Sequence, residues 1–579
     1  MKGARDCKTV TTLILAVLAF FVFLSIAHIV ETNGGKVDVD RLTIATSEGA
    51  VLSAKLWRPK NASAENPAPA VILVPGGNAN LEYMSATSLE LARRGYVAIA
   101  IDPFTIGRSD VIQPSPDLGA SSTLAYIKQL DFVDKDAIGM VGWSAGVGRM
   151  NAAAINPDGS PNGVKALFGF GAGAPGDPEL PINQGFFIGK IETTYGFGVE
   201  KQRDINTSRA FTAGMQTDYV EFATWYGDLA NNKGRILYTG WTGHILGLIS
   251  KSGVWAACHF FNDALAPAPN SHVTNFIFGW KELSTALAMV ALVVVMVALG
   301  SLLLKTSFFR PLLKTDKQVI QAQGGPVMWG MLVLFSLFGA LIAKTAVYNG
   351  QQILNKTGFL QIANVNGFVF WLLCLTAFSI VLLVARILFD KNLDKAALKD
   401  HVRTSIPDLL KSLLLGLTVI LFAYFLVSLG DQFLKISPRF WKVQLNVLTP
   451  KRLSLWLIYL PLYLIPMVVF NILQTSAYYF ENRPRLFRLL VWAANTLPAL
   501  LFVLYVYGKI IFTGLTPITN AAMSRANGSM LDALLLMLPV SFISTGFYHK
   551  TKNLYIGAFL NALLFAWAAV GTDLITFLG

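Results

Sequence analysis

Hydrophobic runs long enough to cross a membrane are the feature that most constrains this 579-residue chain. One run, Val10 to Val30, stands near the start, and eight more follow Lys281 at about the 20-residue spanning length. With 54% hydrophobic and only 14% charged residues, the chain needs lipid to cover much of its surface, which excludes a soluble cytosolic enzyme and a disordered protein. The eight later runs are Leu283 to Leu304, Val327 to Val347, Phe368 to Phe389, Leu409 to Leu429, Leu453 to Leu473, Leu489 to Ile511, Met530 to Phe547 and Leu554 to Phe577.

The first run is either a signal peptide or an uncleaved anchor, because basic residues precede it. Its apolar stretch is longer than a signal-peptide core, and no clear small-x-small cleavage site follows it. We therefore expect residues 1–31 to form a transmembrane anchor, with a cleaved signal peptide as the alternative. Together with the later runs this predicts nine spans, eight of them in a membrane domain over residues 281–579.

The orientation follows from loop charges, since cytoplasmic loops are enriched in Lys and Arg. If the N-terminus is inside, Lys356 is the sole basic residue of one outer loop and Arg525 that of another, whereas the inner loops contain clusters of Lys and Arg. We predict a multi-pass cell-membrane protein with a cytoplasmic N-terminus and the region 32–280 outside. The net charge of +13 then suits loops facing membrane lipids, and nucleic acid is not expected as a partner. The inner clusters are Lys305, Arg310, Lys314 and Lys317; Arg386, Lys391, Lys395, Lys399 and Arg403; Arg483, Arg485 and Arg488; and Lys550 and Lys552.

The region 32–280 differs from the rest, because short apolar runs alternate there with helix-length segments and Gly/Pro turns. Strands separated by helices imply right-handed crossovers and a mostly parallel sheet with flanking helices. The fold class is therefore an α/β domain joined to an all-α multi-span membrane domain. The predicted strands are Ala70 to Val74, Val97 to Ile101, Ile138 to Gly142, Ala166 to Phe170, Phe186 to Ile188 and Arg235 to Tyr238.

The third predicted strand ends in Gly142-Trp143-Ser144-Ala145-Gly146, which fits the pattern G-x-S-x-G in a strand-to-helix context. A serine in such a tight turn exposes its hydroxyl, and flanking glycines allow the strand and the helix to approach closely. The alternative is a glycine-rich turn whose serine caps a helix.

Further chemistry-bearing residues follow other predicted strands. The first strand ends in Val74-Pro75-Gly76-Gly77, where backbone N–H groups are available to an oxyanion, although Gly-Gly is also ordinary turn chemistry. Glu192 follows the fifth strand, and His244 follows the sixth; of six histidines only His244 is so placed. Asp102 precedes the serine, and its loop is expected to be structural.

Together these features resemble the α/β-hydrolase superfamily over about residues 40 to 265. The resemblance implies that Ser144 is the nucleophile, His244 the general base and Glu192 the acid that orients it, with the N–H groups of Gly77 and Ala145 as oxyanion donors. The family often has His-Gly where this chain has Pro75-Gly76, and it more often uses Asp as the acid. Asp204 is therefore the alternative to Glu192.

The function predicted is a membrane-integrated serine hydrolase that cleaves an ester or thioester of a lipid-like or acylated substrate at the outer membrane face. No cofactor and no metal are expected, since three scattered cysteines and six histidines show no ligand spacing. The alternatives are an acyltransferase that uses the same triad, and a transporter or receptor-like protein whose hydrolase-fold domain only binds.

Two other segments bear on the site. The insertion between Thr193 and Gly234 is rich in aromatic residues, and it either shapes an acyl pocket, packs on the membrane or is plain helix packing. The outer loop from Gly430 to Arg452 breaks the charge rule, because Lys435, Arg439 and Lys442 are interleaved with aromatics. It is interpreted as an interfacial anchor. A sharper hypothesis is that it covers the mouth of the hydrolase site.

Overall fold

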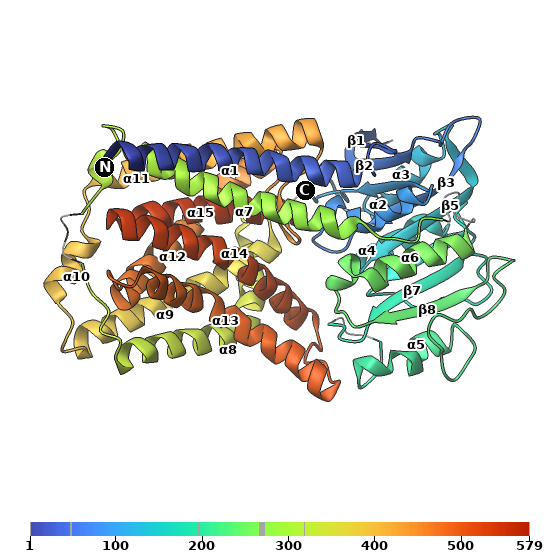
Figure 1. Ribbon diagram of the computed structural model, residues 1–579. Coiled ribbons are helices and arrows are strands. Elements are labelled where there is room, and N and C mark those ends of the chain that lie inside the picture. Colours follow the sequence, from blue (N-terminus) through green and yellow to red (C-terminus); the bar gives the residue numbers. More distant parts are fainter. Residues whose placement is uncertain are drawn as a thin grey trace. The chain divides into compact units, whose positions relative to one another are not determined.

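The computed structural model describes residues 2–46, 49–193, 197–265, 272–315, 317 and 319–577. These residues form two compact units (Figure 1). The sheet unit comprises Ile26–Leu283, Val506–Ser524 and Thr572–Gly579. The helical unit comprises Met1–Ser25, Ser284–Tyr505 and Arg525–Gly571. The sheet unit thus contains two segments that the sequence places in the membrane domain.

The sheet has eight strands in the order β1-β2-β4-β3-β5-β6-β7-β8. β1 pairs with β2 and β2 with β4 in antiparallel fashion, and all other neighbours are parallel. All six predicted strands are confirmed as β3 to β8, whereas β1 and β2 were not predicted. The bounds are β1 (Val37–Ala45), β2 (Val51–Pro59), β3 (Ala68–Val74), β4 (Val97–Ile101), β5 (Val133–Trp143), β6 (Ala166–Phe170), β7 (Asn183–Gly189) and β8 (Arg235–Gly240).

Helices cover both faces of this sheet, as burial of the apolar strands β3 to β6 requires. α2 (Ser85–Arg93) packs against α6 (Lys251–Ala264), and α3 (Ala120–Ile127) packs against α4 (Ala145–Ala154). The expected insertion contains the 3-10 helix η2 (Gln202–Thr207) and the short α5 (Arg209–Thr212). Its aromatic side chains pack on the sheet, as in the contact between Phe211 and Phe186, so it includes ordinary core packing.

Among the described residues, eight helices are long and apolar enough to cross a membrane, which is compatible with a multi-pass membrane protein. The ninth predicted span, Leu554 to Phe577, is a shorter apolar helix, α15 (Leu554–Val570), followed by residues of the sheet unit. The eight are α1 (Lys2–Glu31), α7 (Phe278–Leu303), α8 (Pro326–Leu354), α9 (Ala363–Phe389), α11 (Ile406–Leu429), α12 (Pro450–Tyr478), α13 (Pro484–Thr513) and α14 (Ala521–Thr551).

The loop from Gly430 to Arg452 contains a short π-helix, Gly430–Leu434, and a two-stranded hairpin of β9 (Arg439–Phe440) and β10 (Val443–Gln444). Within the helical unit, the ammonium of Lys442 lies 2.7 Å from the carboxylate of Asp532 on α14. This cation is therefore paired with a protein carboxylate. The hypothesis that the loop covers the hydrolase site stays a prediction.

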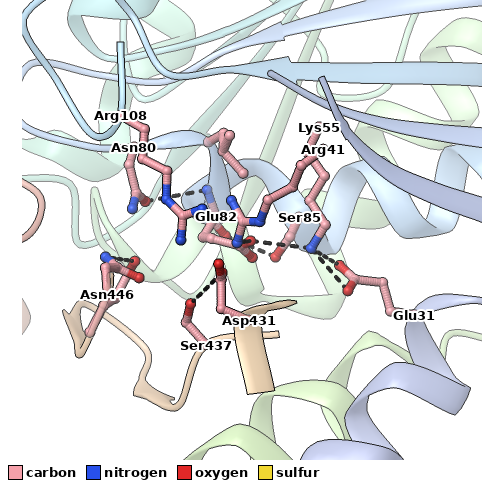
Figure 2. A network of polar contacts seen from close by, with 12 residues as sticks. Glu31, Arg41, Lys55, Asn80, Glu82, Ser85, Arg108, Asp431, Ser437 and Asn446 are labelled. Atoms are coloured by element: carbon pink, nitrogen blue, oxygen red, sulfur yellow. Dashed lines mark hydrogen bonds and ion pairs between the residues drawn. The ribbon is translucent and has the colours of Figure 1, made fainter. Parts of the chain in front are cut away.

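A group of buried charges lies where the end of α1 and the start of α7 meet the sheet, and Figure 2 shows three of its members, Glu31, Lys55 and Glu82. Lys55 on β2 is fully buried, and its Nζ lies 2.9 Å from Glu31 at the end of α1 and 3.2 Å from Glu82. Lys281 at the start of α7 also pairs with Glu31, and it lies 3.8 Å from Glu82. Because a buried charge is tolerated only when it is paired, these contacts fix the end of α1 and the start of α7 against the sheet.

The start of α7 has a second attachment. The Glu90 carboxylate on α2 accepts hydrogen bonds from the backbone N–H groups of Ile277 (2.6 Å) and Phe278 (3.1 Å). It also pairs with Arg93 and Arg94 at 2.7 and 2.8 Å. A carboxylate at a helix N-terminus satisfies otherwise unpaired amides and complements the helix dipole.

Removing the buried cation tests this attachment. Lys55→Met is expected to lower the free energy of unfolding by about 3–5 kcal/mol, because it leaves Glu31 and Glu82 buried with one counter-charge fewer. The matched control is Lys60→Met, which removes an exposed pair with Asp38 at 3.7 Å and is expected to cost less than about 1 kcal/mol. Thermal unfolding of the purified chain in detergent measures both, and equal losses of stability would contradict the assigned role of Lys55.

Candidate active site

Ser144 stands in the tight turn between β5 and α4. Its backbone has φ 53° and ψ −122°, a combination that residues other than glycine rarely adopt. The Ser144 N–H donates to the Phe170 carbonyl on neighbouring β6 at 2.9 Å, and the side chain is partly exposed. The turn therefore presents the hydroxyl at the carboxyl edge of the parallel sheet, where the strand loops meet.

The glycines of the motif are required by close backbone contacts. A Cβ at Gly142 would lie 2.6 Å from the Cα of Val147, and a Cβ at Gly146 would lie 2.2 Å from the carbonyl oxygen of Val74. Neither position accommodates a side chain, because the contacting atoms are backbone. The pattern G-x-S-x-G thus has a steric cause in this fold.

His244 and Glu192 are brought together from the loops that follow β8 and β7. The imidazole Nδ1 lies 2.9 Å from Glu192 Oε1, with only 14% and 2% of the two side chains exposed. The same carboxylate oxygen accepts the Thr193 N–H at 2.8 Å. A buried carboxylate on Nδ1 favours the tautomer in which Nδ1 carries the proton and Nε2 is the unprotonated, basic nitrogen.

Two further residues position the histidine. The Trp143 ring, next to the serine, lies 5.3 Å from the His244 ring between centroids, and its indole N–H donates to the His244 carbonyl at 3.1 Å. Gly171, with φ +63°, lies so close that a Cβ there would be 2.6 Å from His244 Nδ1. The serine turn and the histidine loop are therefore connected by direct contacts.

The two expected oxyanion donors are neighbours, since a Cβ at Gly77 would lie 3.9 Å from the Cβ of Ala145. The loop of Gly77 is held by Arg149 on α4, whose guanidinium donates to the carbonyls of Pro75 and Gly76, both at 2.9 Å. Burial lowers the pKa of Arg149 to about 10, so the side chain remains charged at neutral pH.

The other two acids have different positions. Asp204 lies on η2 with an exposed side chain, so Glu192, and not Asp204, is the carboxylate on His244. Asp102 is buried and accepts backbone N–H groups from Leu81 and Arg108, both at 2.9 Å. Burial raises the pKa of Asp102, and its contacts are those of a structural residue, as expected from its place before the serine.

Sequence reasoning missed Arg149 and Gly171. Arg149 lies five residues after the serine, a spacing that carries no recognisable signal, and it acts by contacting a loop far away in the sequence. Gly171 follows the strand β6 and reads as an ordinary turn glycine. Only its proximity to His244 in space distinguishes it.

No family model matches this chain. The uncharacterized protein PA2218 of Pseudomonas aeruginosa is 31% identical over 129 residues, which cover 21% of this chain and 34% of that protein. The chain thus spans about a third of this curated relative. The crystal structure of PA2218 aligns with a TM-score of 0.21 and 29% identity, covering 24% of this chain and 43% of that one.

Solved structures with less sequence identity include the esterase LipW and the protein Est1E. LipW from Mycobacterium marinum is 15% identical with a TM-score of 0.30, and the alignment covers 44% of this chain and 90% of that one. Est1E from Butyrivibrio proteoclasticus, solved with ferulic acid bound, is 18% identical with a TM-score of 0.28, covering 38% and 98%. These TM-scores are too low to support an argument. The assignment of the sheet unit to the α/β-hydrolase fold is based instead on its strand order and its serine turn.

The packing of Gly171 generates a test of the site. Gly171→Ala is expected to displace His244 and to lower the rate of hydrolysis of a p-nitrophenyl ester about a hundredfold, since small misplacements of a reacting group have large effects. Gly148→Ala is the control, because a Cβ at this helical glycine meets nothing within 4 Å. A rate in Gly171→Ala equal to that of the control would contradict the arrangement.

Proposed function

We propose that this chain is a membrane-integrated serine hydrolase that cleaves an ester or thioester of an amphiphilic or acylated substrate through an acyl-enzyme on Ser144. The observation that carries the proposal is the buried pair of Glu192 and His244, which lies at the same sheet edge as the serine turn and is connected to it by Trp143. A mere binding domain has no need of a carboxylate aligned on a histidine beside a strained serine.

Acylation follows from these roles. The Ser144 oxygen attacks the carbonyl carbon of the substrate while His244 Nε2 takes the hydroxyl proton. Glu192 accepts the Nδ1–H and stabilises the imidazolium that forms. The negative charge on the former carbonyl oxygen is bound by the N–H groups of Gly77 and Ala145. His244 then donates its proton to the leaving alcohol or thiol as the carbon–oxygen or carbon–sulfur bond breaks.

Deacylation uses the same groups in reverse order. His244 Nε2 takes a proton from water, the resulting hydroxide attacks the acyl carbon, and the same two N–H groups bind the second oxyanion. Collapse of this intermediate returns the proton to Ser144 and releases the acid. The pairing of Pro75 and Gly76 with Arg149 supports the role of Gly77, because it prevents movement of the loop that carries this donor.

The membrane arrangement proposed is nine spans with the N-terminus cytoplasmic and the sheet unit outside the cell. It is supported by the loop charges and by the helix ends that belong to the sheet unit. These are the end of α1, the start of α7, the end of α13 and the segment that follows α15. If every long helix and α15 cross once, all four ends fall on one side. The substrate is then met at the outer face, among membrane lipids.

The triad is tested by substitution. Ser144→Ala and His244→Ala are each expected to lower kcat for a p-nitrophenyl ester by about a thousandfold or more, and the double variant to be little worse, since triad members act as a unit. Glu192→Gln is expected to be far more damaging than Asp204→Asn, because the Glu192 carboxylate contacts His244 whereas Asp204 is an exposed residue of η2. Steady-state kinetics on the full chain in detergent measure these effects, with thermal unfolding to verify folding.

Two results would contradict this assignment. Hydrolysis at an undiminished rate in Ser144→Ala would exclude the acyl-enzyme at this residue. A larger loss in Asp204→Asn than in Glu192→Gln would transfer the role of the acid to Asp204.

A further inference from the structure

The end of α13 forms part of the sheet unit. Residues Val506–Ser524 belong to this unit, and they are joined to the insertion that follows Glu192. The Gln202 N–H donates to the Gly514 carbonyl at 3.0 Å, and Lys201 forms an antiparallel bridge with Leu515. Gly514 has φ +78°, and a Cβ there would lie 3.2 Å from the Lys201 side chain, so the two segments are in close contact. We call residues 506–515 the α13 extension.

The α13 extension reaches the loop of the catalytic histidine. A Cβ at Gly243, the residue before His244, would lie 3.2 Å from Cε1 and 3.6 Å from the hydroxyl oxygen of Tyr507. Ile511 follows Tyr507 by four residues, so both lie on the same face of the helix. Ile511 therefore lies about one helical turn after Tyr507, which contacts the histidine loop, and Phe512 is the next residue of the helix.

Large apolar side chains of the extension and the histidine loop are exposed. Phe512 is 88% exposed and Ile511 51%, while Trp241 and Leu246, on either side of His244 in the sequence, are 76% and 46% exposed. We call these four residues the apolar rim. The ammonium of Lys190 lies 5.6 Å from the centroid of the Trp241 ring, so a cation stands beside the rim.

The two halves of the rim are linked through the proximity of Gly243 and Tyr507. Apolar side chains this exposed are costly in water unless lipid or a ligand covers them. The occupant of the rim follows from the chain itself, because α13 is one of the helices long and apolar enough to span a membrane, and its C-terminal residues then lie at the membrane boundary. An exposed Trp with a nearby Lys, as in the pair of Trp241 and Lys190, is typical of that boundary.

We propose that the apolar rim receives the acyl chain of an ester that resides in the membrane, and that the α13 extension leads this chain from the bilayer to Ser144. This inference rests on the proposed function and names its substrate class: a lipid with a long acyl chain, and not a water-soluble ester. The acyl carbonyl reaches the serine while the chain lies along Ile511, Phe512, Trp241 and Leu246.

The experiment compares two esters on the full chain reconstituted in phosphatidylcholine vesicles. p-Nitrophenyl palmitate is carried in the bilayer, and p-nitrophenyl acetate is supplied in the buffer. In the double variant Ile511→Ser/Phe512→Ser, the ratio of kcat/KM for the palmitate to that for the acetate is expected to fall about tenfold or more, because two large apolar contacts to the chain are lost. Both residues are exposed, so the fold is expected to tolerate the change.

The matched control is Tyr219→Ser, which removes an aromatic side chain that is 56% exposed elsewhere on the insertion and is expected to leave the ratio as in the wild type. If the wild type hydrolyses both esters and the double variant keeps the wild-type ratio, the inference is overturned and the proposed function stands. If the wild type hydrolyses neither ester, the proposed function fails, and this inference fails with it.

Discussion

The strained backbone of Ser144 is the constraint on which the candidate site depends. A positive φ at a residue with a side chain costs on the order of 1–3 kcal/mol, and it persists only where the surroundings determine it. Here β5 lies between β3 and β6, and the Ser144 N–H is bonded to Phe170. Gly142 and Gly146 let α4 begin directly against β5 and β3. This turn also positions the N–H of Ala145, one of the two proposed oxyanion donors, and Trp143. Trp143 in turn contacts His244.

Buried charges are a second constraint, and they act on the connection between helices and sheet. Lys55 is placed on β2 where it meets Glu31 and Glu82, and Lys281 completes the group. Since each of these charges would be costly alone, the end of α1 and the start of α7 cannot leave the sheet without exposing or unpairing one of them. The same sheet unit includes the α13 extension beside His244. The end of α1, the start of α7 and the α13 extension thus belong to the same compact unit as the serine turn.

The sequence predicted those parts of the fold whose signal is local. Strands β3 to β8 were found because parallel strands buried on both faces read as apolar runs between turns. β1 and β2 were missed, because β1 alternates charged and apolar residues and β2 contains Lys55, which reads as a surface residue and is in fact buried. The α13 extension was not predicted either, since helical apolar periodicity is the same whether the partner is lipid or protein.

Within the site, the resemblance to α/β-hydrolases led to Glu192 and His244, and the two side chains are in contact. The choice between Glu192 and Asp204 depended on the loop after β7, whose course no local pattern determines. Arg149 and Gly171 were not predicted, because their roles arise from contacts between residues distant in the sequence. Such contacts exist only once the sheet has formed.

The central claim is that Ser144 is an activated nucleophile. The most direct measurement is to treat the full chain with a fluorophosphonate, which reacts with activated serines, and to locate the adduct by peptide mass mapping. The account predicts one adduct per chain, on the peptide that contains Ser144, and its absence in Ser144→Ala and in His244→Ala. An adduct at another residue, or labelling that persists in Ser144→Ala, would contradict it.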